Sequence, residues 1–389
     1  MADETTLNPT ELIEEGRADA AQASPEWALG RGFSIAKSYR QSPAYQERLT
    51  RLTEIVAAVT SGAQRMDKLI EAMSSSDFPL LFGDVLDRML LGEYNDVPSD
   101  WRGYVRIARV RDFRTVKKYR VDGAMSPLLP VGPQEEYKHT ALSESSYEYS
   151  VKKYGRKIGF DWESMINDDL DILTDIPRRF ARASTRTERR FVTGLYAGPS
   201  GPLSTFYTVG NLNIITGNPV FSRTSLQAAL LSLATARDAD GEPILIEMVH
   251  LVVPPALEVE ALNVLNSTQL IIGADTDAER MMVNNWMQNR LTLHVDPYLP
   301  IISSTANGNT SWYVFADPAT TAPALEVAFL RGYEAPQVFV KAPDSIVLSG
   351  ADPIPVDFDT DTQIYKVRHV FGGSQVDPSM TRASNGSGT

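Results

Sequence analysis

The stretch TDIPRRFARASTRTERRFVTGLY, residues 174–196, decides how the rest of the chain is interpreted. Its larger or less polar side chains recur every three or four residues, which is the period of one helix face. Thr174 can cap the start of this helix, and Gly194 with Gly198-Pro199 marks its end. The pattern predicts a helix of ~30 Å at 1.5 Å per residue. The recurring positions are Ile176, Phe180, Ala183, Thr187, Phe191 and Leu195.

The rest of this predicted helix surface is strongly basic. An isolated helix of this kind is usually a solvated face with one apolar stripe. A second interpretation is that the basic side chains pair with carboxylates of another molecule. From Arg178 onward, six arginines stand against one acid, Glu188: Arg178, Arg179, Arg182, Arg186, Arg189 and Arg190.

Composition excludes several kinds of chemistry. The chain has 389 residues and no cysteine, so disulfides, thiolate metal sites and cysteine nucleophiles are excluded. No apolar run approaches the ~18 residues of a membrane span, and the acidic start Met1–Glu15 lacks a signal pattern. We therefore expect an intracellular protein with a substantial core and no membrane contact.

Charge is distributed unevenly along the sequence. The net charge is −8 over residues 1–100, +6 over 101–190 and −10 over 191–389, for a total of −12. The basic middle favours either nucleic-acid contact or self-association, in which this segment lies on the acidic surface of the next copy. The acidic total argues against a dedicated, tight nucleic-acid binder.

A long hairpin precedes the basic helix. Tyr104–Val121 is rich in β-branched and aromatic residues, residues 122–146 are polar and contain Pro and Gly, and Tyr147–Val151 alternates again. An isolated two-stranded ribbon is marginal in water, so this hairpin needs another surface, most simply a second copy of the chain. Residues 1–43 are expected to form an arm, followed by helices over 44–73 and 77–91, the latter closed at Gly92.

The second half of the chain predicts a separate block of helices and strands. Helices are expected over 224–238 and 255–265 from their apolar spacing. The tail from Ser379, rich in Ser, Gly and Asn, is expected to be mobile or laid on the surface. Strands are expected over 244–253, 291–295, 312–316, 325–330, 337–341 and 364–371.

No motif for catalysis or cofactor binding stands out. The histidines His139, His250, His294 and His369 are far apart in sequence, without metal-site spacing. His250 and His294 fall in strand-like runs, where buried or interface positions are expected. Asp275–Asp277 and Asp357–Asp361 lack the Gly and Glu of calcium loops, Gly198–Gly201 lacks a phosphate-loop lysine, and no GxSxG is present. No catalytic, metal or cofactor residues are predicted.

The order of several short segments resembles the major capsid proteins of tailed double-stranded DNA phages. The fold of that family is named for phage Hong Kong 97, and the sequence looks most like its Mu-like head subunit branch. The resemblance covers roughly residues 75–378. The segments are Val253-Pro254-Pro255, Leu291–Pro297, Trp312–Pro318, Leu325–Tyr333 and Phe358–Asp361 leading into Tyr365–Gly372.

The resemblance implies an α+β fold of four parts. An N-terminal arm would take residues 1–100. A peripheral domain would take 101–219, with an extended β-hairpin loop at about 122–160 and a long spine helix at 172–197. An axial αβ domain would take 220–350, and 351–389 would supply the return strand of the peripheral domain and the C-terminal tail.

The resemblance also implies a function. Copies would assemble as hexamers and pentamers into an icosahedral head around double-stranded phage DNA, in the bacterial cytoplasm, with portal and decoration or scaffolding proteins as partners. The alternative is an encapsulin-type compartment shell; a carboxylate hydrolase and a nucleic-acid binding module also stay open. The prototype joins its subunits by Lys–Asn bonds, but no motif assigns one here, so non-covalent assembly is expected. The candidate inter-subunit or DNA-facing residues are the six helix arginines with Lys138, Lys152 and Lys153.

Overall fold

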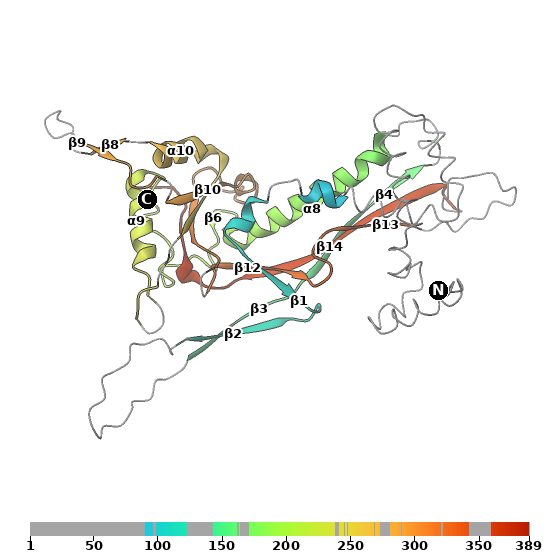
Figure 1. Cartoon of the computed structure of the whole chain (residues 1–389), viewed down its shortest axis with the longest axis horizontal. Helices are drawn as coiled ribbons and strands as arrows, with labels where there is room; N and C mark the ends of the chain where they lie inside the picture. The colour runs from blue at the N-terminus through green and yellow to red at the C-terminus, as the bar shows by residue number, and fades with distance from the viewer. Residues whose placement is uncertain are drawn as a thin grey trace, which may run out of the picture. The chain divides into compact units, whose positions relative to one another are not determined.

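A computed structural model gives the architecture of the chain (Figure 1). It describes residues 90–95, 99–122, 143–161, 163, 171–237, 241–244, 246, 248–267, 269–272, 281–288, 290–319, 322–341 and 359–388. Two compact units are present, and they are described separately below. One is made of Met1–Asn95, Gly155–Ala181 and Gln337–Arg368, and the other of Asp96–Tyr154, Arg182–Pro336 and His369–Thr389.

A four-stranded sheet forms the centre of the second unit. Its strand order is β10-β7-β11-β15, with β10 parallel to β7 and the other neighbours antiparallel. All five residues of β11 are buried, as expected for a strand that is covered on both faces. The strands are β7 Val249–Val253, β10 Leu291–Val295, β11 Trp312–Ala316 and β15 Thr381–Ser384.

Alternate residues of β11 face two different cores, because successive side chains of a strand point to opposite faces. Trp312 and Val314 pack with helices α9 (Arg223–Ala234) and α10 (Glu258–Asn266). The short 3-10 helix η2 (Pro255–Leu257) directly precedes α10. Tyr313 and Phe315 pack in the second core, whose other large side chains include Trp101, Tyr104, Tyr196, Tyr207, Phe329 and Phe371.

The C-terminal tail is part of this core, which contradicts the predicted mobile or surface-laid tail. Strand β15 pairs with β11 from Trp312↔Ser384 to Phe315↔Thr381, and its four residues are buried. Small side chains allow this strand to fit against its neighbours. Arg382 is accommodated because its guanidinium donates to the side chain and carbonyl of Ser232 on α9.

The predicted strand over 104–121 is two strands in different sheets. β1 (Arg106–Val110) pairs parallel with β12 (Leu325–Leu330), while β2 (Val116–Asp122) pairs antiparallel with β3 (Ser143–Tyr149). Residues 111–115 between them form a bend. The antiparallel pairing from Val116↔Tyr149 to Asp122↔Ser143 confirms the predicted hairpin.

Strand β14 (Thr362–Gln375) is longer than the predicted 364–371 and belongs to both units. In the second unit it pairs with β12, from Leu325↔Gln375 to Phe329↔Phe371. In the first it pairs with β13 (Gln337–Val340). Strands β12 and β13 therefore share a sheet with β14, although the resemblance places them in the axial part. The boundaries of the four-part division otherwise stay predictions.

In the first unit, β4 (Lys152–Asp161) also pairs with β14. The last part of the range expected for the projecting loop, 122–160, is therefore a strand of the body. Residues 90–95 are helical, so the predicted helix over 77–91 does not stop at Gly92. Leu90 and Tyr94 explain this extension, because both are buried against Phe180, Tyr365 and Val367.

The predicted helix over 174–196 is confirmed as α8, Asp171–Tyr196. Phe180 is buried, but the other described positions of the predicted stripe, from Ala183 to Leu195, are half-buried. The most buried face is rotated from the predicted one and includes an acid. Gly194 lies within the helix rather than ending it. The buried residues are Phe180, Ala181, Ser184, Thr185, Glu188, Val192, Thr193 and Tyr196.

The remaining elements are short. The predicted helices and strands between 224 and 341 are present with small boundary shifts, and the strand predicted over 244–253 is shortened to β7. Within the described residues, no helix is both long and apolar enough to cross a membrane. Most of the predicted arm, the hairpin tip and Asp275–Asp277 lie outside the described residues. The short elements are η1 Asp100–Gly103, β5 Ala197–Gly198, β6 Gly201–Pro202, β8 Gln269–Ile272, β9 Met281–Asn284, α11 Leu299–Ile302 and η3 Pro378–Met380.

Candidate assembly surfaces

The β2–β3 hairpin forms a separate two-stranded sheet, so among the described residues no third strand pairs with it. Its side chains alternate in exposure: Tyr119 is 66% exposed, while Lys118 and Tyr147 are half-buried and Tyr149 is buried. One face of the hairpin base therefore packs against its own chain, and the other face stays open to solvent.

A single buried carboxylate anchors the packed face. Glu326, on β12, is only 1% exposed. It accepts hydrogen bonds from the Tyr149 hydroxyl at 2.5 Å and the Tyr147 hydroxyl at 3.2 Å, and it forms an ion pair with Lys118. All three donors come from β2 and β3. The buried charge is thus compensated only while the hairpin base is in place.

The two tyrosines of this anchor keep their protons at alkaline pH. Burial, and next the charge of Glu326, raise the pKa of Tyr147 to about 12. Burial and the hydrogen bond to Glu326 also raise the pKa of Tyr149. Both hydroxyls therefore remain hydrogen-bond donors to Glu326 at alkaline pH.

The three predicted lysines do not lie together on the hairpin. Lys138 lies outside the described residues. Lys152 and Lys153 are exposed, but they belong to β4 rather than to the hairpin. The Lys153 ammonium lies 5.9 Å from the ring centre of Phe113, in the bend between β1 and β2. These two lysines are therefore placed on the body of the chain.

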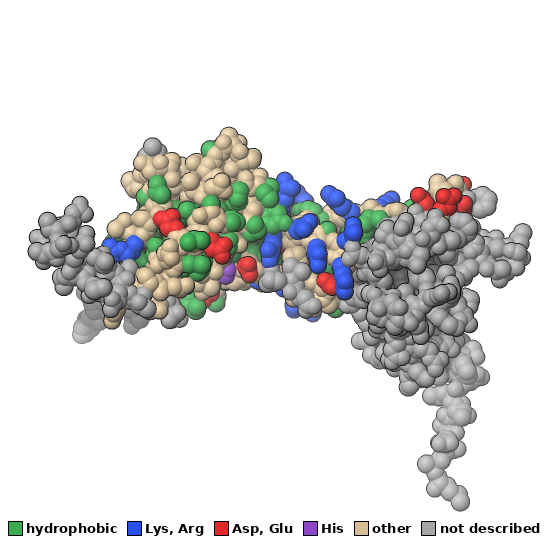
Figure 2. Space-filling model, turned by 90° about the horizontal axis from the view of Figure 1, so that it is seen from above, with side chains coloured by type: hydrophobic (Ala, Val, Ile, Leu, Met, Phe, Trp, Pro, Cys, Tyr) green, Lys and Arg blue, Asp and Glu red, His purple; other side chains and the backbone are tan. Residues whose placement is uncertain are grey.

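The arginines of α8 form an exposed basic face, except that Arg189 is half-buried. Figure 2 shows Lys and Arg side chains gathered over the helix in the view from above. Arg178 pairs with Glu93 at 2.9 Å. Arg182, Arg186 and Arg190 follow at intervals of four residues, and within the described part of the chain no ion pair involves them. Like charges at this spacing destabilise a helix slightly, so an outside anion would stabilise this face.

Glu188 of α8 lies apart from the basic face and has a structural partner. Glu188 is 1% exposed, and His369 on β14 lies within hydrogen-bond distance of it, at 2.6 Å. Arg102 lies 4.0 Å from its other oxygen. This contact fixes the helix to the strand in the second unit, and its cost of desolvation is offset by the close partner.

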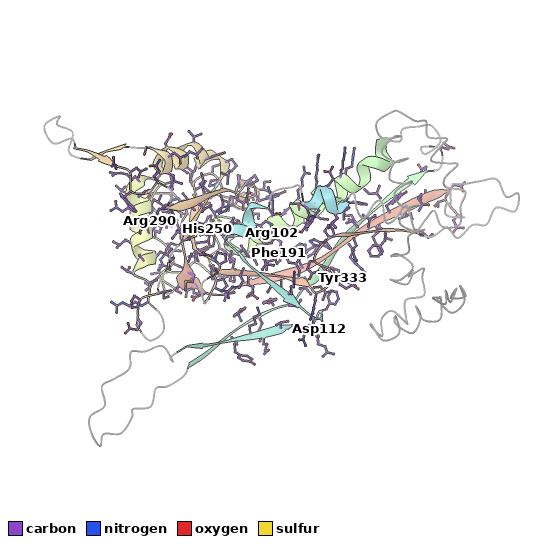
Figure 3. All side chains as sticks on the ribbon, in the orientation of Figure 1. Arg102, Asp112, Phe191, His250, Arg290 and Tyr333 are labelled. Carbon is purple, nitrogen blue, oxygen red and sulfur yellow. The ribbon has the colours of Figure 1, made fainter. Side chains whose placement is uncertain are left out.

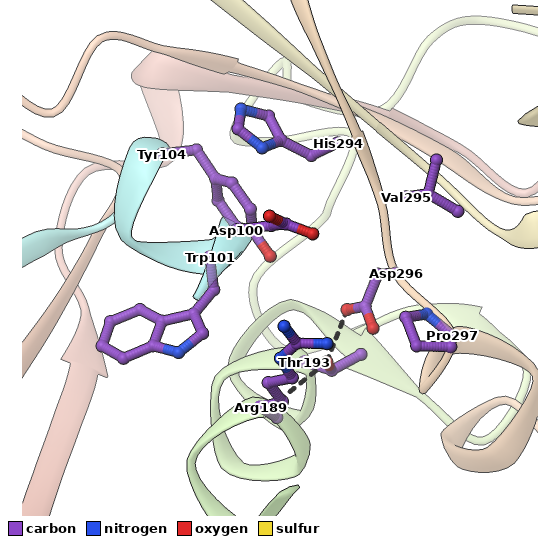
Figure 4. A pocket seen from close by; sticks show the side chains of 9 residues that line it. All are labelled: Asp100, Trp101, Tyr104, Arg189, Thr193, His294, Val295, Asp296 and Pro297. Atoms are coloured by element: carbon purple, nitrogen blue, oxygen red, sulfur yellow. Dashed lines mark hydrogen bonds between the residues drawn. The ribbon is translucent and has the colours of Figure 1, made fainter. Parts of the chain in front are cut away.

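A small pocket of about 20 Å³ lies at the end of the same helix (Figure 4). Asp296 accepts hydrogen bonds there from Thr193 and from Tyr196, each at 2.5 Å. Burial, and next the charge of Asp296, raise the pKa of Tyr196. The carboxylate is occupied by hydroxyl donors of its own chain, and the space holds little more than a water molecule. The arrangement connects α8 to β10 rather than forming a substrate site.

Two histidines that are distant in sequence meet on the parallel strands β7 and β10. Nδ1 of His250 and Nε2 of His294 are 3.0 Å apart, so one ring donates to the other. Burial, and next the neighbouring His250, lower the pKa of His294 to about 4. In the part of the chain that the structure describes, no group of three or more His, Asp or Glu could hold a metal ion.

Sequence reasoning missed the anchoring role of Glu326. A signal was present, because LEVAFL at 325–330 places one acid in an otherwise apolar, buried-type strand. Such an acid requires a partner. The partners could not be predicted, since Lys118, Tyr147 and Tyr149 are distant in sequence and meet it only in the folded chain.

Comparison with known proteins identifies the class. The sequence model of the phage capsid protein family matches residues 144–381, which is more than half of the chain. No curated protein sequence matches. This chain belongs to the phage capsid protein family, and it is a structural protein of the virion.

Similar solved structures include phage capsids. Similarity to Mycobacterium phage Adephagia has 10% identity over 76% of this chain and 89% of that one, with a TM-score of 0.45. The structure from Mycobacterium phage Patience is 11% identical over 79% of this chain and 89% of that one, with a TM-score of 0.44. The virus-like particle from Pyrococcus furiosus is 11% identical over 77% of this chain and 97% of that one, with a TM-score of 0.42.

Proposed function

We propose that the chain is a major capsid subunit of the Hong Kong 97 type, in its Mu-like branch, and that it assembles as hexamers and pentamers into a head around double-stranded DNA. The observation that carries this proposal is the β2–β3 hairpin. It is fixed at its base by Glu326 and has one open face. A ribbon of this kind is marginal alone and gains stability on a sister copy.

The basic face of α8 supplies the second contact of the proposal. Arg182, Arg186 and Arg190 pair with carboxylates of a neighbouring copy, together with Lys138, Lys152 and Lys153. The acidic stretches 1–100 and 191–389, with net charges of −8 and −10, offer such carboxylates. Packaged DNA is the competing anion, and portal, decoration or scaffolding proteins would complete the particle.

Electron microscopy of the purified protein tests the proposal. Hollow particles built of hexamers and pentamers are expected, and a persistent monomer in phage lysate would contradict it. Particles that hold a protein cargo and no DNA would instead favour an encapsulin-type compartment.

Charge reversal tests the basic face. The triple variant Arg182→Glu, Arg186→Glu, Arg190→Glu is expected to stay unassembled. The control Arg237→Glu is expected to assemble normally, because the Arg237 guanidinium donates to the Gly241 carbonyl of its own chain. Assembly from nucleic-acid-free protein distinguishes pairing with carboxylates of a neighbouring copy from pairing with DNA. If the triple variant forms normal empty particles but fails only to retain DNA, the arginines face DNA.

A further inference from the structure

An apolar groove of about 290 Å³ lies beside helix α9 in the second unit. Leu231 on α9 is 64% exposed, and Trp286 is 42% exposed. The block around them is otherwise well packed, with both sheet faces covered. Exposed apolar side chains that line a groove mark a contact site for another molecule. The principal lining residues are Leu230, Leu231, Ile246, Val249, Trp286 and Arg290.

The groove has a cation at its rim. Arg290, which is labelled in Figure 3, is exposed. Its guanidinium lies 5.8 Å from the ring centre of Trp286. Among the described residues, no ion pair involves Arg290. It lies in the stretch 191–389, where the net charge is −10, so a basic group here is uncommon. The groove therefore favours a partner with apolar side chains and an acid beside them.

The outer side of α10 has the matching chemistry. Ala261 and Leu265 of this helix face the core, whereas Val259 is 69% exposed and Leu262 is 39% exposed. Val259 and Leu262 are three residues apart, so they share one side of the helix, and Glu258 lies next to them. Within the described residues, Glu258 has no ion-pair partner. Its position in the first helical turn keeps the carboxylate at the edge of the apolar pair.

We infer that the outer side of α10 in one copy docks in the α9 groove of a second copy. Val259 and Leu262 enter the groove, and Glu258 pairs with Arg290. This inference rests on the proposed function, since it requires the chain to self-assemble. It joins two different surfaces, so the contact is heterologous. Such a contact repeats from copy to copy and produces a ring when the rotation closes.

The absence of cysteine from the sequence allows a direct test. In the double variant Leu231→Cys, Val259→Cys, mild oxidation of assembled particles is expected to give a ladder of covalent oligomers that reduction removes. A disulfide forms only when the two Cα atoms lie within ~7 Å. Each single variant is expected to give no ladder. The matched control combines Val259→Cys with Val209→Cys, an 80% exposed position outside the groove.

Charge reversal gives an independent readout. Arg290→Glu and Glu258→Arg are each expected to reduce particle yield on the order of tenfold, and the double reversal should restore it. Glu260→Arg is the matched control, because it reverses the same charge on a helix position turned away from Val259 and Leu262. All variants should elute as folded subunits before assembly.

The outcomes separate this contact from the proposed function. Normal particles without a ladder, and with unaffected yield in both reversals, overturn the docking of α10 and leave the capsid proposal standing. A disulfide confined to monomers also overturns it, since the two surfaces would then meet within one chain. If a different protein occupies the groove instead, particles of the Leu231→Cys variant will form normally and that protein will protect the new cysteine from alkylation, which also overturns the docking of α10. Failure of the unmodified chain to form particles contradicts the proposed function itself.

Discussion

Buried charged residues connect distant parts of this chain. Glu326, Glu188 and Asp296 are each at least nine-tenths buried, and each receives hydrogen bonds from segments more than 90 positions away in sequence. A buried carboxylate without such partners costs several kcal/mol. These residues therefore specify which segments meet: the hairpin base on β12, β14 on α8, and β10 on α8.

The hairpin anchor gives a prediction for a single substitution, Glu326→Gln. Glu326→Gln keeps the shape of the side chain but removes the charge that Lys118 and two tyrosines compensate. We expect the free energy of unfolding to fall by about 2 kcal/mol, with faster amide exchange in β2 and β3. Urea unfolding and hydrogen exchange measure both.

Glu148→Gln is the control for this anchor. Glu148 lies on the same hairpin and pairs with Lys117 at 2.7 Å, but both side chains are about half exposed. Its loss is expected to change the stability by less than about 0.5 kcal/mol. Equal effects of the two substitutions would show that Glu326 has no special anchoring role.

The histidine pair predicts acid sensitivity. The pKa of His294 is about 4 in the folded chain and 6.5 ordinarily, so between these values the unfolded chain binds more protons. The protonation of His294 therefore does not lower the free energy of unfolding above pH 6.5, and lowers it progressively as the pH drops toward 4. With allowance for the partial exposure of the ring, the loss is about 1–2 kcal/mol. Burial also lowers the pKa of His250, which acts in the same direction.

Comparison with His294→Gln isolates this contribution. Urea unfolding of the unassembled subunit at pH 7.5 and pH 5 should show a smaller pH dependence in the variant than in the original chain. An identical pH dependence would mean that the carboxylates, rather than the histidine pair, account for acid destabilisation.

At the scale of elements, close backbone contacts decide how strands lie together. A Cβ added at Gly372 of β14 would lie 2.2 Å from the Ser150 carbonyl oxygen and 2.9 Å from the Cα of Val151. Both neighbours are backbone atoms that cannot move separately from their segment. Glycine is thus required there for β14 to approach residues 150–151 in the second unit.

Two glycine substitutions should act in opposite directions. Gly372→Ala forces the segments apart and is expected to cost about 1–3 kcal/mol. Gly194→Ala, inside α8 with no atom outside the helix's own backbone within 4 Å of the added Cβ, should stabilise by about 0.5–1 kcal/mol. Thermal and urea unfolding of the two variants provide the measurement, and a stable Gly372→Ala protein would refute the close approach.

At the scale of the whole chain, the last strand completes the central sheet of the second unit. β15 and the turn before it bury Met380 and Ala383, and Ile214 bridges to Ala383 of this strand. Without β15, β11 would become an exposed edge with five apolar residues, which favours aggregation. The C-terminal segment is therefore needed for folding of this unit.

Truncation tests the role of the last strand. A chain that ends after Val376 is expected to be insoluble or rapidly degraded in limited proteolysis. A chain that ends after Ser384 keeps β15 and should remain soluble and protease-resistant. Soluble, compact protein from the shorter chain would show that β15 is dispensable.

Sequence periodicity alone determined the long helix α8, the strands near 291–295, 312–316 and 325–330, and the hairpin, because these patterns reflect local backbone geometry. The resemblance in the order of motifs predicted the family, which the match over residues 144–381 shows. Tertiary structure alone decided that Glu188 is buried, that Glu326 anchors the hairpin and that the tail is a core strand. These depend on pairing between segments far apart in sequence, and a Ser/Gly-rich tail or a lone acid carries no local signal of the partner that will cover it.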